Sequence, residues 1–176
     1  RQHEGRADLH VFRHAIRRRR RSVTGAGNGR LCLRRDRGRK RHQSACLFSP
    51  PESWQAEDGR ILLVMHVAGR NARSYRKAWI GAADEFNAML IVPEFGKDQF
   101  PKSSNYQQGR MYRRLVANMK PRTDWTISTV DRLINDVFRR LGESPRPICL
   151  YGHSGVGQFV HRYMMFGRAK RIVRAV

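Results

Sequence analysis

The chain has 176 residues and a formal net charge of +22, and this length suffices for one domain with a sizeable hydrophobic core. No stretch approaches the roughly 18 consecutive apolar residues of a membrane-spanning helix. The three cysteines have neither the spacing of a structural zinc site nor the density of a disulfide framework. The sequence therefore argues against a membrane-embedded protein, a zinc finger and a disulfide-stapled scaffold.

The first 42 residues hold a disproportionate share of the charge. They contain 15 of the 36 Lys and Arg residues and 3 of the 14 Asp and Glu residues, a net of +12. Their single aromatic residue is Phe12, and no apolar period is sustained. Such a segment cannot bury enough surface to offset its ordering entropy. We therefore expect 1–42 to be a disordered Arg-rich tail.

The purpose of this tail has more than one interpretation. A basic arm can hold nucleic acid or another anionic surface electrostatically, but the tail can equally be a solvated extension or a spurious sequence that was never selected as protein. Aromatic residues interleaved for base stacking are missing, which disfavours nucleic acid as a partner. No apolar segment follows the arginine run at 17–21, so we expect no signal peptide and take a cytoplasmic location as the default.

The composition changes at residue 45, where a domain spanning 45–176 is expected to begin. The run "RILLVMH" is continuously apolar, as expected of a strand that is covered on both faces. The elements predicted for the first half of the domain are, in chain order, a short strand at 45–48, a strand at 60–66, an amphipathic helix at 72–86 and a strand at 88–95.

The second half begins with a polar, irregular connection at 96–122, of a length that is usually functional or mobile. The stretch "DWTISTVDRLINDVFRRLG" is the clearest amphipathic helix, and a strand at 148–152 and a last helix follow. The residues that this last helix is expected to bury are Val156, Phe159, Val160, Tyr163 and Met164. The alternation of strands and helices predicts an α/β fold, with a mainly parallel sheet and flanking helices.

Ser154 stands at the junction between the strand 148–152 and the last helix, in the stretch "ICLYGHSGVGQF". A sharp turn at the carboxyl end of a parallel strand lifts a serine hydroxyl clear of the sheet. It also aims the first amides of the following helix at the same point, where they can stabilise an oxyanion. Alternatively, this stretch is an ordinary strand-to-helix turn in which Ser154 is the N-cap of the last helix.

Two motifs carry a resemblance to a known family. "LYGHSGVGQFVHRY" resembles the nucleophile elbow of the α/β-hydrolases, particularly the branch of poly(3-hydroxybutyrate) depolymerases and related esterases, where the elbow runs Gly-His-Ser-Ala-Gly-Gly-Gln. Upstream, "VMHVAGRNARSYRKAW" resembles the oxyanion loop that follows the third strand in this family. The resemblance covers roughly residues 45–170, and the two motifs stand in the expected order.

The resemblance implies a partial α/β-hydrolase fold and a serine-type hydrolase that acts on carboxylic esters through an acyl-enzyme. Ser154 would be the nucleophile, and the backbone amide of Gly155 would be one oxyanion donor. The second donor would be the backbone amide of Val67 or Ala68. Neither a metal nor an organic cofactor is implied, and the substrate would be a small-molecule or polymeric ester.

Three departures from the family pattern stand against this. Valine occupies position 156, where the family has glycine, and a β-branched side chain there is expected to strain the turn or push strand and helix apart. Val67 stands where the family has glycine after histidine, and would resist a left-handed conformation by about 1–2 kcal/mol. The 22 residues after Ser154 contain no Asp or Glu and one histidine, His161, whereas family triads run Ser, acid, His.

We therefore expect a hydrolase domain truncated before its triad Asp and His, nearly inactive as it stands, with an uncovered edge beside the strand 148–152. A non-catalytic pseudohydrolase and a basic binding protein are the alternatives. His66 is expected to shape the oxyanion loop, and His153 to serve the loop rather than catalysis. Arg110, Arg113 and Arg114 could meet an anionic substrate, although a solvated loop explains them as well.

Overall fold

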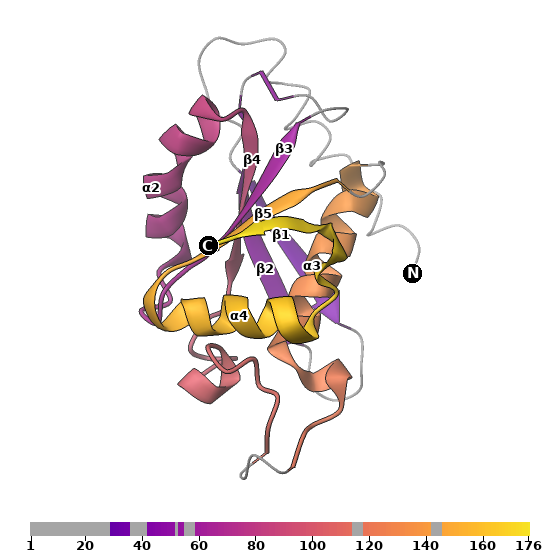
Figure 1. Cartoon of the computed structure of the whole chain (residues 1–176). Coiled ribbons are helices and arrows are strands. Elements are labelled where there is room, and N and C mark those ends of the chain that lie inside the picture. Colours follow the sequence, from indigo (N-terminus) through magenta and orange to yellow (C-terminus); the bar gives the residue numbers. More distant parts are fainter. Residues whose placement is uncertain (1–28, 36–41, 52, 55–58, 114–117, 142–145) are drawn as a thin grey trace.

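The computed structural model describes residues 29–35, 42–51, 53–54, 59–113, 118–141 and 146–176. They form one six-stranded sheet in the order β1-β2-β4-β3-β5-β6, with helices on both faces (Figure 1). The strands are β1 (Gly29–Arg35), β2 (His42–Ser49), β3 (Arg60–Met65), β4 (Ala88–Glu94), β5 (Ile148–Gly152) and β6 (Ile172–Ala175). The α-helices are α2 (Ala72–Glu85), α3 (Thr126–Leu141) and α4 (Gly157–Phe166).

The sheet is parallel from β4 through β3 and β5 to β6, and antiparallel where β2 joins β1 and β4. The predicted mainly parallel α/β sheet is therefore confirmed. In the described part of the chain, no helix has the length and apolar character needed to cross a membrane.

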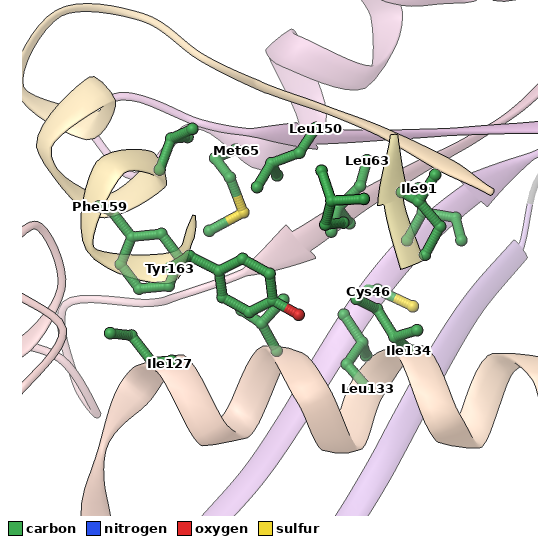
Figure 2. Packing of buried hydrophobic residues seen from close by; sticks show 14 of the residues in the cluster. Cys46, Leu63, Met65, Ile91, Ile127, Leu133, Ile134, Leu150, Phe159 and Tyr163 are labelled. Carbon is green, nitrogen blue, oxygen red and sulfur yellow. The ribbon is translucent and has the colours of Figure 1, made fainter. Parts of the chain in front are cut away.

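The larger core lies between the sheet and the layer formed by α3 and α4. Apolar residues recur at steps of three and four along α3, so one stripe of this helix faces the sheet. Figure 2 shows Ile127 and Leu133 of α3 facing strand residues such as Met65, with Phe159 of α4 closing the cluster. Each such side chain contributes about 1.5–3 kcal/mol when fully buried. A smaller cluster lies under α2 on the opposite face.

Strand β1 lies inside the segment that the sequence predicted to be disordered. It pairs antiparallel with β2, with Gly29 opposite Phe48 and Arg35 opposite His42. Averaging the composition over 1–42 concealed the short apolar run Leu31-Cys32-Leu33 between arginines, which is consistent with a short strand. The rest of the predicted tail, 1–28 and 36–41, lies outside the described residues.

The predicted open edge beside β5 is wrong, because β6 pairs with β5 in parallel. Two further hydrogen bonds extend this pairing: Gly152 N–H donates to the Val176 carbonyl at 2.8 Å, and Val176 N–H donates to the Leu150 carbonyl at 3.0 Å. Strand β6 was not predicted from the sequence, because it is four residues long and follows α4 after a connection of only five residues. Met164 was expected to be buried, but it is 39% exposed at the border of the buried stripe of α4.

Candidate active site

The chain turns sharply where β5 meets α4. His153 is extended, with φ of −103° and ψ of 151°, whereas Gly157 is already helical, with φ of −54° and ψ of −35°. Between them Ser154 has φ of 60°, the left-handed region that costs a residue with a β-carbon about 1–2 kcal/mol. The Ser154 side chain is exposed, at the carboxyl end of an inner parallel strand.

A close approach of strand and helix depends on Gly152. A methyl group on this residue would lie 2.5 Å from Cγ2 of Val160 and 3.2 Å from the carbonyl oxygen of Val156. The expected strain at Val156 is not found. This residue has φ of −84° and ψ of −17°, an ordinary helical conformation, and its side chain is fully buried in the larger core. The tight contact therefore falls two residues before Ser154, and not two residues after it.

The loop that follows β3 emerges beside this corner. Met65, the last residue of β3, pairs with Gly152, the last residue of β5. Adjacent strands lie about 4.8 Å apart, so the segment 66–68 and Ser154 leave the sheet as neighbours. The loop closes as a turn in which Arg70 N–H donates to the Val67 carbonyl at 3.0 Å. Its left-handed residue is Arg70, with φ of 62°, so the expected penalty at Val67 does not arise.

His66 is fully buried at the start of this loop. Its Nε2 accepts a hydrogen bond from the Phe95 N–H at 3.1 Å, which leaves Nδ1 to carry the proton and donate to the Val67 carbonyl at 3.1 Å. Burial lowers the pKa of this imidazole, so the neutral ring is favoured. With both nitrogens engaged, His66 braces the loop against the end of β4 and has no free lone pair for a proton from Ser154.

Arg70 and Tyr106 join the loop after β3 to the connection that follows β4. The buried Tyr106 hydroxyl donates to the His66 carbonyl at 2.6 Å. The Arg70 guanidinium lies 4.2 Å from the centre of the Tyr106 ring and donates to the carbonyls of Phe95 at 3.2 Å and Phe100 at 2.7 Å. This part of the predicted irregular connection is therefore anchored. Neither Arg70 nor Tyr106 was predicted from the sequence to have this anchoring role.

Gln107 follows Tyr106 and reaches the corner itself. Its Nε2 lies where a side chain at position 155 would begin: a methyl group on Gly155 would be 2.2 Å from this nitrogen. Gly155 is not left-handed, so the constraint on this glycine is space and not backbone conformation. The sequence contained no local signal for this contact, which joins residues 48 positions apart.

A base for Ser154 is not found among the described residues, where no imidazole or carboxylate hydrogen-bonds its hydroxyl. His153 is exposed beside the corner, and His161 is exposed on α4. The amides of Val67 and Ala68, in the loop beside this corner, both remain candidates for the second oxyanion donor.

The fold is similar to that of several solved hydrolases. No protein-family model matches the chain, and no curated protein matches it. The structure is similar to poly(aspartic acid) hydrolase-1 from Sphingomonas sp. KT-1, with a TM-score of 0.73 and 32% identity over 86% of this chain and 55% of that one.

It is also similar to a poly(3-hydroxybutyrate) depolymerase from Bordetella parapertussis, with a TM-score of 0.69 and 26% identity over 82% of this chain and 50% of that one. An acetyl xylan esterase from Aspergillus awamori, with a TM-score of 0.57 and 10% identity over 84% of this chain and 50% of that one, shows the fold alone. The chain spans about half the length of each of these proteins.

Proposed function

We propose that this chain, which has an α/β-hydrolase fold and resembles poly(3-hydroxybutyrate) depolymerases and related esterases, provides the nucleophile of a serine-type hydrolase of carboxylic esters. The observation that carries the proposal is the conformation of Ser154: left-handed and exposed, on the corner after an inner parallel strand. Strain at a residue with a free polar side chain is a feature of functional sites.

In the proposed reaction the Ser154 Oγ attacks the ester carbonyl carbon, and its proton passes to a base. The resulting oxyanion accepts hydrogen bonds from the backbone amides of Gly155 and of Val67 or Ala68. The C–O bond to the alcohol then breaks, the base returns the proton to the departing oxygen, and acyl-Ser154 remains. Water repeats the sequence and releases the acid. We assign no base among the described residues, because His66 is committed to the loop and neither His153 nor His161 hydrogen-bonds the Ser154 hydroxyl there.

The test uses a fluorophosphonate probe, whose electrophilic phosphorus reports an activated serine, on the 176-residue chain. An oxyanion hole without a complete triad still supports about 10³–10⁴-fold acceleration over water, so slow labelling of Ser154 is expected. Imidazole in the buffer, acting as an external base, should raise the rate.

Ser154→Ala should abolish this adduct, whereas Ser74→Ala, at an exposed serine on α2, should leave it unchanged. Mass spectrometry of the labelled peptides measures the outcome. Equal labelling of the wild-type chain and Ser154→Ala would overturn the proposal.

A second substrate class is favoured by charges in the connection after β4. Burial lowers the pKa of Lys120, and the nearby Arg110 and Arg113 lower it further, whereas Asp124 opposes this shift in part. The Arg110 Nε is buried and makes no hydrogen bond within the described chain. A polymer bearing carboxylates would compensate these charges, and the similar Sphingomonas protein is named for such a polymer, poly(aspartic acid).

Binding of poly(aspartic acid) distinguishes this class from neutral polyesters. It should weaken steeply as salt rises, and it should weaken in Arg110→Ala but not in Arg73→Ala, at an exposed arginine of α2. Equal binding by both variants, measured by fluorescence anisotropy of a labelled polymer, would reject the anionic class and leave the ester class. Arg114 lies outside the described residues.

A further inference from the structure

The carboxamide of Gln107 lies against the backbone that would hold the oxyanion. Its Nε2 fills the place of a side chain on Gly155, and its Cδ would lie 3.3 Å from a methyl group there. The side chain is half-buried, and within the described residues neither its N–H groups nor its oxygen has a hydrogen-bond partner. A polar group is thus held at the corner with its hydrogen-bonding capacity unused.

The position of Gln107 is fixed from both sides. Before it, the Tyr106 hydroxyl donates to the His66 carbonyl at 2.6 Å, one residue ahead of the segment 67–68. After it, the Gly109 carbonyl accepts the Thr126 N–H at 2.8 Å, at the start of α3. The segment 106–109 therefore spans from the loop after β3 to α3 and passes over the corner on the way. A side chain on such a segment is preorganised, because its backbone need not reorder when a substrate arrives.

We infer that Gln107 is a substrate-contacting residue of the proposed hydrolase, and that its Nε2–H donates a hydrogen bond to the carbonyl oxygen as this oxygen becomes an oxyanion. The inference rests on the proposed function of Ser154. Three donors would then meet the oxygen: the Gly155 amide, the amide of Val67 or Ala68, and the Gln107 carboxamide. Loss of one oxyanion-hole donor costs about 10²–10³-fold in rate, and a half-exposed side-chain donor belongs at or below the lower end of that range.

A substitution of Gly155 tests the contact with the Gln107 carboxamide independently. The elbow of the resembling family has alanine at this position, and Gly155 has no left-handed conformation that would oppose a side chain. A methyl group 2.2 Å from Nε2 must displace the carboxamide. Gly155→Ala and Gln107→Ala therefore remove one and the same interaction, so their effects on the rate should not add.

The experiment measures the rate of fluorophosphonate labelling of Ser154 in the full chain, with imidazole present. Gln107→Ala is expected to lower this rate about 10- to 100-fold, toward the loss of one donor, with an unchanged Tm. Gly155→Ala should lower it by a similar factor, and the double variant should be no slower than either single one. Gln108→Ala is the matched control, since Gln108 is the exposed neighbour on the same segment, and it should label at the wild-type rate.

Gln107→Glu separates hydrogen-bond donation from mere packing. Its side chain has the same size but, when ionised, offers no donor and repels an oxyanion, so it should label more slowly than Gln107→Ala at neutral pH. Below its carboxyl pKa, which is about 4.3 in the absence of perturbation, it regains an O–H donor. The rate of Gln107→Glu relative to Gln107→Ala should therefore rise as the pH falls.

The outcomes separate the two proposals. If the wild-type chain labels no faster than Ser154→Ala, both the proposed function and the role of Gln107 are overturned. If the wild-type chain labels at Ser154 while Gln107→Ala, with an unchanged Tm, labels at the same rate, only the role of Gln107 is overturned. Additive losses in the double variant would equally overturn it, because they would show that the two substitutions act on different contacts.

Discussion

Ser154 and Arg70 are left-handed residues in two neighbouring loops, with φ of 60° and 62°, but their surroundings differ. The Arg70 guanidinium donates to the Phe95 and Phe100 carbonyls and covers the Tyr106 ring. These contacts offset a backbone cost of about 1–2 kcal/mol. The Ser154 side chain has no hydrogen-bond partner in the described chain, so its conformation is held by backbone hydrogen bonds, such as that from the Gly157 N–H to the Ser154 carbonyl, and by the packing around it. The comparison separates strain that a side chain compensates from strain that leaves a side chain free for chemistry.

The largest effect on stability is expected at Arg70, whose side-chain contacts offset the cost of its left-handed backbone. Arg70→Ala removes the charged donor shared by two carbonyls and the contact with the Tyr106 ring, while the left-handed cost stays. Hydrogen bonds to charged groups contribute about 1.5–3 kcal/mol, so the free energy of unfolding should fall by about 2–4 kcal/mol in urea denaturation. Arg70→Gly loses the same contacts but relieves the backbone, and it should be about 1 kcal/mol more stable than Arg70→Ala. The reverse order would show that the turn is not left-handed.

Gly152→Ala should disrupt the packing of β5 against α4 that supports the corner at Ser154. The added methyl group meets Val160 Cγ2 at 2.5 Å and the Val156 carbonyl at 3.2 Å, and overpacking of this kind costs about 1–3 kcal/mol. Gly157→Ala is the matched control, since its methyl group would lie 3.5 Å from the Gly152 carbonyl, an ordinary contact. Thermal unfolding should show a lower Tm for the first variant and an unchanged or higher Tm for the second. Equal Tm values would contradict the close approach.

The pH dependence of the free energy of unfolding tests how far His66 stabilises the loop that contains Arg70. Burial lowers its pKa in the folded state below the ordinary value of 6.5, so below that pH the unfolded chain binds the proton more readily. The neutral His66 ring makes its full contribution to the free energy of unfolding above about pH 6.5. This contribution is lost as the pH falls toward the pKa of the folded state, by at most about 1.4 kcal/mol per pH unit. The difference in unfolding free energy between the wild-type chain and His66→Gln, measured from pH 7.5 to 5, should narrow in this way. A constant difference would show that His66 does not titrate on unfolding.

The smallest effect is expected at Ser154 itself. Ser154→Gly permits the left-handed conformation freely, whereas Ser154→Ala keeps the cost, so the glycine variant should be more stable by about 1 kcal/mol or less, since glycine also gains entropy when unfolded. Both variants should lose labelling by the fluorophosphonate probe. Denaturant unfolding of the pair decides the point, and a less stable glycine variant would contradict a strained corner.

The elements that carry a local pattern could be predicted from the sequence. The alternation of apolar runs and helical stripes predicted β3, α2, β4, α3, β5 and α4, and the short motif around Ser154 predicted a corner at the end of a strand. The supports of that corner could not be predicted, because they join residues far apart in the chain. Tyr106 reaches His66 across 40 positions, and Arg70 reaches Phe100 across 30.

Two mistaken expectations have the same physical origin. At Val156 and Val67 the departure from the family pattern was read as strain on the assumption that each position needs the freedom of glycine. The structure meets the spatial requirement at Gly152 and the left-handed requirement at Arg70. Gly152 is itself a glycine of the family pattern, and Arg70 is left-handed without being a glycine, so neither valine occupies a position that needs the freedom of glycine.

The edge of the sheet at β6 supports the corner at Ser154 through backbone hydrogen bonds. Because the Gly152 N–H donates to the Val176 carbonyl, the backbone amide two residues ahead of Ser154 is tied to the residue that follows β6, the outermost strand of the described sheet. Short edge strands open first in local unfolding, so each such opening releases this amide to solvent. How long β6 stays paired with β5 therefore limits the lifetime of the corner at Ser154, together with the packing beneath it.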